Sequence, residues 1–317
     1  MKVLVATDKP FAKVAVNGIK EVVENAGFEL ALLEKYTDKS QLLEAVADVD
    51  AMIIRSDLAT KEVIDSAKNL KIIVRAGAGY DNIDLSAATE KGVVAMNTPG
   101  QNSNAVAELA LGMMVYAARG LFNGKSGSEL KGKTLGIHAY GNVGKLVGVI
   151  AKGFGMKIAA FDPFVSAEAI EADGVKVYNS VDELYSNCEY ISLHIPANDK
   201  TKNSINFELL NKMPKGATLV NTARKEVVKE SDLVKLMTER TEFKYVSDIA
   251  PDNAEELLSK FAGRVYFTPK KMGAQTEEAN VNAGIAAAQQ IVKFLKNGDK
   301  TFQVNKWFFC YLRKQLY

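Results

Sequence analysis

The stretch KTLGIHAYGNVGKLVGVIAKGFGMKIAAFD, residues 133–162, decides the fold of this chain. It begins with a short apolar run, residues 134–138, that has the length of a β-strand. A glycine-containing turn and a segment with helical spacing, residues 142–154, follow, and a second apolar run is closed by Asp162. Strand, glycine turn, helix, strand and acid in this order are typical of a dinucleotide-binding βαβ unit.

The residue types of this unit suit the pyrophosphate and the adenosine ribose of a dinucleotide. Glycines let the backbone approach a pyrophosphate, whose charge meets the amide groups and dipole of the helix N-terminus. Asp162 can accept the ribose hydroxyls and would repel a 2′-phosphate, so NAD is favoured over NADP. Ala139 replaces the usual first glycine, and on the motif alone an ordinary βα turn is the alternative interpretation. The expected cofactor contacts of the turn are Gly141, Asn142, Val143 and Gly144.

The rest of the chain alternates short β-rich runs with segments of helical spacing. Before residue 97 the β-rich runs are residues 2–6, 28–33, 51–54, 71–74 and 93–96. Such alternation predicts parallel, doubly wound sheets, and it resumes after Asp162. We therefore expect an α/β protein with two Rossmann-like domains and a cleft between them.

Domain boundaries follow from turn residues and helix length. The turn-rich segment 97–104 is a predicted boundary, and a long alanine-rich helix from Glu277 can return to the first domain. The predicted domains are a discontinuous substrate-binding domain, residues 1–98 and 279–306, and an NAD-binding domain, residues 99–278. Residues 307–317 change in character and are interpreted as a non-native or read-through tail, with a genuine terminal strand or helix as the alternative.

Composition narrows the class of protein. The 317 residues are 47% hydrophobic, which provides core for about two domains. The net charge of +2, from 40 basic and 38 acidic side chains, does not indicate a nucleic-acid or membrane partner. Two cysteines cannot form a disulfide framework, and no apolar run suits a signal peptide or a membrane span. We expect a cytoplasmic protein, and no residue cluster has the spacing of a metal site.

One segment indicates a partner subunit. Residues 105–121 have helical character and are apolar on almost every face, so the predicted helix must be buried on all sides. A subunit interface is a natural way to bury it. We therefore predict a homodimer with this helix near the two-fold axis.

Polar residues gather where the predicted strands end. Arg55 and Ser56 follow the third strand, and the glycine-rich loop 75–79 follows the fourth. The carboxyl ends of strands form the binding crevice of open α/β sheets, and an arginine with backbone amides suits an anionic ligand. For Arg55 alone, a solvated surface arginine is the alternative.

Several segments together resemble the D-2-hydroxyacid dehydrogenase family, and within it the phosphoglycerate branch. The resemblance implies NAD-dependent oxidation of 3-phospho-D-glycerate to 3-phosphohydroxypyruvate by hydride transfer, the first step of serine biosynthesis. A glyoxylate or hydroxypyruvate reductase and a non-catalytic NAD-sensing protein are the alternatives. The segments are RAGAGYDNID (75–84), NTPGQNSNAVAE (97–108), the dinucleotide turn with Asp162, HIP (194–196), VNTAR (220–224) and VSD (246–248).

The same resemblance implies roles for individual residues. Arg224 matches the arginine that binds the substrate carboxylate and carbonyl, a task that suits a planar guanidinium. The implied substrate contacts are Arg55, Ser56, Arg75, Gly77, Gly79 and Asn102. The implied cofactor contacts outside the glycine turn are Ala78, Ile195, Thr222, Ala223, Asp248, Gly273 and Ala274.

The chain departs from the family at the acid/base. The family pattern Pro-His-x-Gly is replaced by PKKMG, residues 269–273, which is one residue longer and lacks the histidine. Counting back from the glycine places Lys271 at the acid/base position and counting from the proline places Lys270 there; we prefer Lys271. Asn253 replaces the glutamate that supports the histidine. A lysine needs its pKa lowered, which a glutamate would oppose, so the two changes are consistent. If neither lysine acts, both are surface charges and the chain is inactive or uses water.

Overall fold

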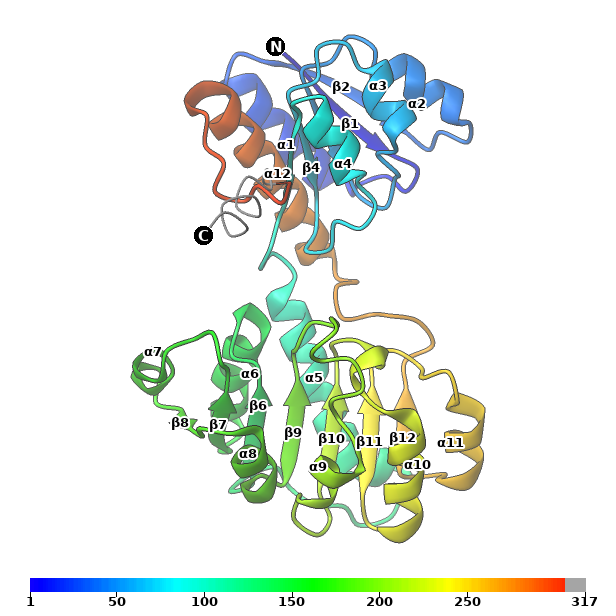
Figure 1. The fold of residues 1–317 in the computed structure, drawn as a ribbon, viewed down its shortest axis with the longest axis vertical. Helices are drawn as coiled ribbons and strands as arrows, with labels where there is room; N and C mark the ends of the chain where they lie inside the picture. The colour runs from blue at the N-terminus through cyan, green and yellow to red at the C-terminus, as the bar shows by residue number, and fades with distance from the viewer. Residues whose placement is uncertain (306–317) are drawn as a thin grey trace, which may run out of the picture. The chain divides into compact units, whose positions relative to one another are not determined.

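The computed structural model describes residues 1–305, so the segment interpreted as a tail, residues 307–317, lies outside the described residues. The chain forms two compact units. One consists of Met1–Asn102 and the chain from Thr276 onward, and the other of Ser103–Gln275. In each unit helices cover both faces of a parallel sheet (Figure 1), which confirms the predicted α/β fold with two doubly wound sheets.

The first unit is built on a 5-stranded parallel sheet in the order β2-β1-β3-β4-β5. The predicted strands agree with the observed ones to within one residue at each end, because each run is buried, β-rich and bounded by turn residues. Short helices after the third and fourth strands join these runs. The strands are β1 (Lys2–Thr7), β2 (Glu29–Glu34), β3 (Ala51–Ile54), β4 (Ile72–Arg75) and β5 (Val94–Asn97), and the helices are α1 (Lys13–Asn25), α2 (Lys39–Ala45), α3 (Lys61–Ser66), α4 (Leu85–Glu90) and α12 (Glu277–Asn297).

Alternation along the strands gives this unit two cores. Val3 and Val5 of β1 pack with α1 and α12 on one face, whereas Leu4 and Ala6 pack with α2, α3 and α4 on the other. A sheet buried on both faces leaves its carboxyl edge, where the loops are polar, as the place for a ligand. The long helix α12 belongs to the first unit and contributes Ala283, Ala287 and Ile291 to one of its cores.

The second unit contains a 7-stranded parallel sheet in the order β12-β11-β10-β9-β6-β7-β8. The strand order reverses between β6 and β9, so the crevice for a ligand lies at the carboxyl ends of these two strands. Its strands are β6 (Thr134–His138), β7 (Lys157–Phe161), β8 (Lys176–Val177), β9 (Tyr190–Leu193), β10 (Thr218–Asn221), β11 (Lys244–Ser247) and β12 (Val265–Phe267). Its helices are α5 (Ser103–Ala118), α6 (Asn142–Gly153), α7 (Ala167–Ala172), α8 (Val181–Asn187), α9 (Phe207–Asn211), α10 (Glu230–Glu239) and α11 (Ala254–Lys260), with 3-10 turns η1 (Gly120–Phe122) and η2 (Lys225–Val227).

Helix α5 is buried mainly inside its own unit. Ala107, Ala110 and Met114 belong to the core that α6 and the sheet share. Glu108 and Gly112 remain exposed in the single chain, so the predicted cover of these faces by a partner subunit stays a prediction. The apolar character of α5 is explained without a partner subunit, because the sheet and α6 cover most of it.

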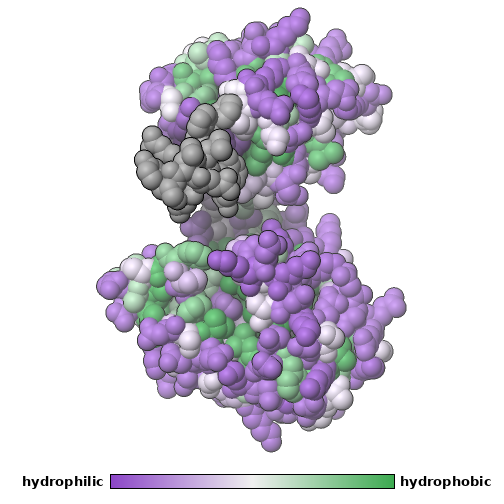
Figure 2. Space-filling model, in the orientation of Figure 1, coloured by the Kyte–Doolittle hydropathy of each residue, from purple (hydrophilic) through white to green (hydrophobic). Residues whose placement is uncertain are grey.

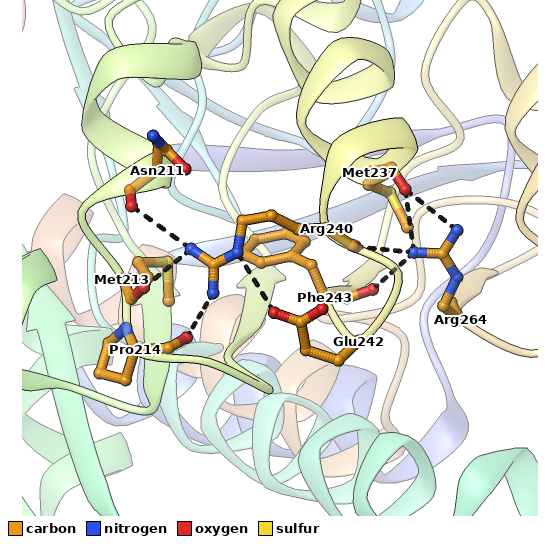
Figure 3. A network of polar contacts seen from close by, with 8 residues as sticks. All are labelled: Asn211, Met213, Pro214, Met237, Arg240, Glu242, Phe243 and Arg264. Atoms are coloured by element: carbon orange, nitrogen blue, oxygen red, sulfur yellow. Dashed lines mark hydrogen bonds and ion pairs between the residues drawn. The ribbon is translucent and has the colours of Figure 1, made fainter.

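Two arginines bind backbone carbonyl groups at the edge of the second sheet where its strands begin (Figure 3). Arg240 donates to the carbonyl oxygens of Met213 and Pro214, which follow α9, at 2.8 and 2.6 Å. Arg264 donates to the carbonyl oxygens of Met237 and Arg240 at the end of α10, at 3.1 and 3.0 Å. The last carbonyls of a helix have no partner within the helix, so Arg264 satisfies those of α10, while Arg240 binds the turn after α9; both lie at the edge opposite the ligand crevice.

Candidate active site

The turn between β6 and α6 has the geometry of an anion-binding site. No side chain caps the N-terminus of α6, so its first amide groups have no side-chain acceptor. No heavy atom lies within 4 Å of a Cβ placed on Gly141, whereas a Cβ on Gly144 would overlap the carbonyl oxygen of Ala139. Ala139 itself has a φ of 80°, the left-handed conformation that favours glycine. The turn therefore keeps its glycine geometry although its first glycine is absent.

Asp162, at the end of β7, faces this turn. Its Oδ2 accepts a hydrogen bond from the Tyr140 amide at 2.7 Å, and its Oδ1 accepts from the amides of Phe164 and Val165 at 2.8 and 3.3 Å. A carboxylate has about four acceptor positions, so Oδ2 retains one for a hydroxyl group. Beside it, Phe164 is 95% exposed, and hydrophobic residues reach the surface around α7 (Figure 2).

Arg224 and Lys271 converge on one carbonyl group. Nη1 of Arg224 lies 2.9 Å from the carbonyl oxygen of Ala223, and Nζ of Lys271 lies 3.4 Å from the same oxygen. The loop that carries the arginine is fixed by Asn221, whose side chain accepts from the Ala223 amide at 2.9 Å and donates to the Arg224 carbonyl at 2.9 Å. Asn221 is buried and was not among the predicted site residues, although it stands inside the VNTAR motif.

Asp248 anchors the loop that carries the lysines. Its carboxylate is 1% exposed and accepts hydrogen bonds from the Thr268 hydroxyl at 3.0 Å and from the amides of Met272 and Gly273 at 2.8 and 2.7 Å. A Cβ on Gly273 would lie 2.9 Å from Oδ2 of Asp248 and 3.2 Å from Val106. The loop is therefore held by its backbone, and a glycine is required where it meets the carboxylate.

The surroundings of Lys271 favour its neutral form. Removal from water, followed by the charge of Arg224, lowers the pKa of the Lys271 amine from its usual value, while Asp248 and Glu226 oppose the change. The side chain is still exposed on its own unit, so water weakens each of these effects. Lys270 is also exposed, and no hydrogen bond or ion pair joins it to the described residues. Of the two lysines, Lys271 is the one placed beside Arg224.

In the first unit, the end of β5 holds the loop 75–79. The Thr98 hydroxyl accepts from the Gly77 amide at 2.7 Å, and the Asn97 side chain donates to the Ala78 carbonyl at 2.6 Å. The Arg75 guanidinium lies across Gly77, where any side chain would overlap it. The loop is thus shaped to hold one guanidinium group at the carboxyl edge of the sheet. Gly79 closes the loop beside Asp81, and Asn102 ends the unit before α5.

Arg55 is tied into its own unit. Its guanidinium donates to the carbonyls of Lys9 and Pro10 at 3.0 and 3.1 Å and to the Asn280 side chain at 2.7 Å. The buried carboxylate of Asp57 accepts from the amides of Asp8 and Arg55 and from the Tyr36 hydroxyl, and this joins the ends of three strands. Asp57 was missed in the sequence because its partners are distant along the chain. Ser56, between the two, is exposed.

Two histidines lie at the carboxyl ends of β6 and β9. Nδ1 of His138 lies 3.1 Å from the Tyr185 hydroxyl, and Nε2 of His194 lies 2.9 Å from the Ser192 hydroxyl. Burial lowers the pKa of His138 to about 4, with Asp162 opposing, and burial and His138 lower the pKa of His194. Both rings are therefore neutral at pH 7 and add no positive charge to the crevice. Ile195, a predicted cofactor contact, is buried directly after them.

Comparison with known proteins decides the family. Residues 114–269 match the family described as D-isomer specific 2-hydroxyacid dehydrogenase, NAD binding domain. The chain is also 38% identical to the hydroxypyruvate reductase of Thermotoga maritima over 84% of this chain and 92% of that relative. The chain belongs to the D-isomer specific 2-hydroxyacid dehydrogenases.

Other relatives of this family carry a different activity in their names. The D-3-phosphoglycerate dehydrogenase of Methanocaldococcus jannaschii is 38% identical over 81% of this chain, which spans about half of that relative, 52% of its length. The crystal structure of NAD⁺-bound 3-phosphoglycerate dehydrogenase from Entamoeba histolytica is 48% identical, with a TM-score of 0.83, and the match covers 97% of this chain and 99% of that one.

NAD is the cofactor of this family, and the second unit fits it. Gly141 leaves the first amides of α6 open to a pyrophosphate, and Asp162 retains an acceptor for a ribose hydroxyl. The hydroxyl oxygen of Thr222, at the end of β10, is buried and has no hydrogen-bond partner within residues 1–305. Ala223, Ala274 and Val143 are partly buried around the same edge. Ala78 lies in the first unit, and its contact with the cofactor stays a prediction.

The position of the family glutamate has a different role in this dehydrogenase. Asn253 begins α11, and its amide donates to the Glu230 carboxylate at 3.2 Å. Its Nδ2 lies 3.5 Å from the Glu256 carboxylate, and its Oδ1 is buried without a partner in the described part of the chain. No hydrogen bond within residues 1–305 joins Asn253 to Lys271. The lysine is therefore held by the loop and not by this side chain.

None of the helices in residues 1–305 combines the length and the hydropathy that crossing a bilayer demands. Within the same residues, no group of three or more His, Cys, Asp or Glu side chains is arranged to bind a metal ion.

Proposed function

We propose that this chain catalyses the NAD-dependent oxidation of 3-phospho-D-glycerate to 3-phosphohydroxypyruvate, the first step of serine biosynthesis. The proposal is supported by the NAD⁺-bound 3-phosphoglycerate dehydrogenase of Entamoeba histolytica, with which the chain shares 48% of its residues over nearly its whole length. The M. jannaschii relative with the corresponding name adds to this support. NAD, when bound, supplies the acceptor for the hydride that leaves C2 of the hydroxy acid.

The observation that carries the mechanism is the convergence of Arg224 and Lys271 on the Ala223 carbonyl. The guanidinium of Arg224 binds the carboxylate and the C2 oxygen of the substrate in a planar, bidentate manner. The adjacent amine of Lys271 then faces the same C2 oxygen. In its neutral form it accepts the hydroxyl proton during oxidation, and as ammonium it donates that proton during reduction.

The lowered pKa of Lys271 suits this task, because it increases the fraction of neutral amine that can accept the hydroxyl proton. Asp248 acts on the lysine as a positioning residue through the loop amides. In the first unit, Arg75, Gly77 and Gly79 of the loop 75–79, together with Asn102, are the proposed substrate contacts. Arg55 and Ser56 are the proposed contacts of the substrate phosphate.

Reduction of hydroxypyruvate is the second candidate, and two observations favour it. The match to the T. maritima hydroxypyruvate reductase covers 92% of that relative, whereas the match to the M. jannaschii dehydrogenase covers 52% of it. The Arg55 guanidinium, the proposed phosphate contact, is already bonded to two carbonyls and to Asn280. An arginine occupied in this way has fewer donors left for a phosphate group.

The experiment is a comparison of 2-oxo acids with NADH. Oxidation of NADH is followed at equal concentrations of 3-phosphohydroxypyruvate, hydroxypyruvate and glyoxylate. We expect the highest kcat/KM with 3-phosphohydroxypyruvate. A higher value with hydroxypyruvate or glyoxylate would replace the proposed substrate. No turnover with any of them, together with tight NADH binding, would identify the non-catalytic NAD-sensing protein.

We also propose that the chain forms a homodimer through the second unit. Phe122, which follows α5, is 66% exposed, Val149 of α6 is 58% exposed, and Phe154, which follows α6, is 43% exposed. Exposed apolar side chains on neighbouring elements are typical of a subunit interface. Light scattering should give twice the chain mass, and Val149→Glu should reduce it, whereas Val14→Glu, on α1 of the first unit, should not. A monomeric mass for the unmodified protein would refute the proposal.

A further inference from the structure

The amine of Lys271 is held loosely and is accessible. Within residues 1–305, its one hydrogen bond, to the Ala223 carbonyl, is 3.4 Å long, at the outer limit of such contacts. The side chain is exposed on its unit, and the backbone of its loop is fixed by the Asp248 carboxylate. The amine can therefore leave this carbonyl without any change in the loop.

A neutral amine next to a bound 2-oxo acid is a nucleophile as well as a base. Partial removal from water and the Arg224 charge lower the pKa of Lys271, which increases the fraction of neutral amine near pH 7. Lysines with lowered pKa values attack carbonyl groups and form imines. A histidine at the same place could not form a stable adduct of this kind, because its ring nitrogen gives no imine. The replacement of an imidazole by an amine thus adds chemistry to the site.

We propose that Lys271 forms a reversible imine with the C2 carbonyl of the 2-oxo acid that Arg224 binds. This inference rests on the proposed function, because the 2-oxo acid is the product of the proposed oxidation. The amine lone pair forms the N–C2 bond while the C2=O π electrons move to oxygen. The two amine hydrogens then leave with that oxygen as water, and the C2=N bond forms. No oxidant or reductant is required, and the addition of water restores both partners.

The position of Arg224 explains why the 2-oxo acid would react with Lys271 and not with the other lysines of the chain. Arg224 Nη1 and Lys271 Nζ share one acceptor, so a carboxylate bound to the guanidinium brings its neighbouring carbonyl to the amine. Lys225, the residue next to the arginine, is instead paired with Asp252 and keeps its charge. The adduct occupies the substrate position and removes the lysine from proton transfer. The 2-oxo acid is therefore expected to inhibit the enzyme slowly when NADH is absent.

The test is reductive trapping of the 317-residue chain. Three parallel samples of the protein, without NADH, are each incubated with sodium cyanoborohydride and one 2-oxo acid: 3-phosphohydroxypyruvate, hydroxypyruvate or glyoxylate. The labelled lysines are then identified by peptide mass mapping. We expect labelling of Lys271 several-fold above that of any other lysine. The label should vanish in Lys271→Arg, persist in Lys270→Arg and decrease in Arg224→Gln. Circular dichroism establishes that each variant is folded.

The outcomes separate this inference from the proposed function. Turnover of a 2-oxo acid with NADH, without selective labelling of Lys271 by any of the three, would overturn the imine and leave the dehydrogenase intact. Selective labelling by hydroxypyruvate or glyoxylate alone, matched by turnover of that acid, would support the imine and change the assigned substrate. Equal labelling of Lys271 and surface lysines would also overturn the inference.

Discussion

Asp248 and Gly273 are in such close contact that the carboxylate of one excludes a side chain on the other. Oδ2 of Asp248 accepts the Gly273 amide at 2.7 Å, and a Cβ at residue 273 would lie 2.9 Å from that oxygen. On the adjacent strand, Asn221 fixes the loop of Arg224 through two hydrogen bonds of 2.9 Å. β10 and β11 pair directly, with Asn221 opposite Ser247, so two neighbouring strand ends place the arginine and the lysine.

The first prediction concerns the acid/base. Lys271→Met should lower kcat by about 10²–10⁴-fold, the usual contribution of a general acid–base, with a smaller change in KM for the substrate. Lys270→Met is the matched variant, because it removes an adjacent exposed amine that forms no hydrogen bond or ion pair within residues 1–305. Steady-state rates of NADH oxidation measure both. A larger loss of kcat in Lys270→Met would transfer the role to Lys270.

The pH dependence has a defined sign. Burial and Arg224 lower the pKa of Lys271 below its usual 10.5, so the amine changes charge in the range below that value. Oxidation needs the neutral amine and should rise with pH through this range, while reduction needs the ammonium and should fall. Glu226 opposes the shift, so Glu226→Gln should move both profiles to lower pH. Glu239→Gln, on α10, should leave them in place. Movement to higher pH would contradict the assignment.

The fold was predictable because its signals are local. Buried β-rich runs, helical spacing and the glycine turn each depend on neighbouring residues, and the strands 51–54 and 134–138 were predicted with the observed bounds. The short helices α7, α9 and α11 were missed, since five to seven residues give too few turns for a periodic pattern. The apolar character of α5 was a correct observation with an incomplete explanation, because the sequence does not show that α6 covers it.

For the candidate site, the sequence predicted the residues proposed to act on the substrate better than the residues that hold them in place. Arg224 and Lys271 were identified from motifs, and the structure places both beside the Ala223 carbonyl. Asp57 and Asn221 were missed because their function depends on hydrogen bonds to residues that the fold brings near. The predicted contact of Asp248 with the cofactor remains a prediction, and the structure adds the hydrogen bonds from the Met272 and Gly273 amides to its carboxylate. Such pairings depend on three-dimensional register, which spacing along a chain does not contain.

The third prediction concerns the loop anchor. In Asp248→Asn, one carboxylate oxygen is replaced by an NH₂ group, which donates hydrogen bonds. The Met272 and Gly273 backbone N–H groups are donors too, so one of these buried donors loses its acceptor. The expected loss of unfolding free energy is about 1–3 kcal/mol, and kcat should fall because Lys271 is no longer held in place. Asp199→Asn, in an exposed loop, is the matched control. Thermal unfolding and kinetics together test this, and an unchanged kcat with reduced stability would show that the loop does not position the lysine.

The last prediction concerns the turn of the dinucleotide unit. Ala139 has a φ of 80°, which costs an L-residue about 1–2 kcal/mol, while a glycine there costs about 0.4–1 kcal/mol in extra freedom of the unfolded chain. Ala139→Gly should therefore raise the free energy of unfolding slightly, by up to about 1 kcal/mol, against the usual effect of glycine. The same change at Ala169, an exposed residue inside α7, should lower it by about 0.5–1 kcal/mol. Urea unfolding of both variants measures whether each change raises or lowers the free energy of unfolding. A loss of stability at residue 139 as large as that at 169 would show that the turn is not strained by its alanine.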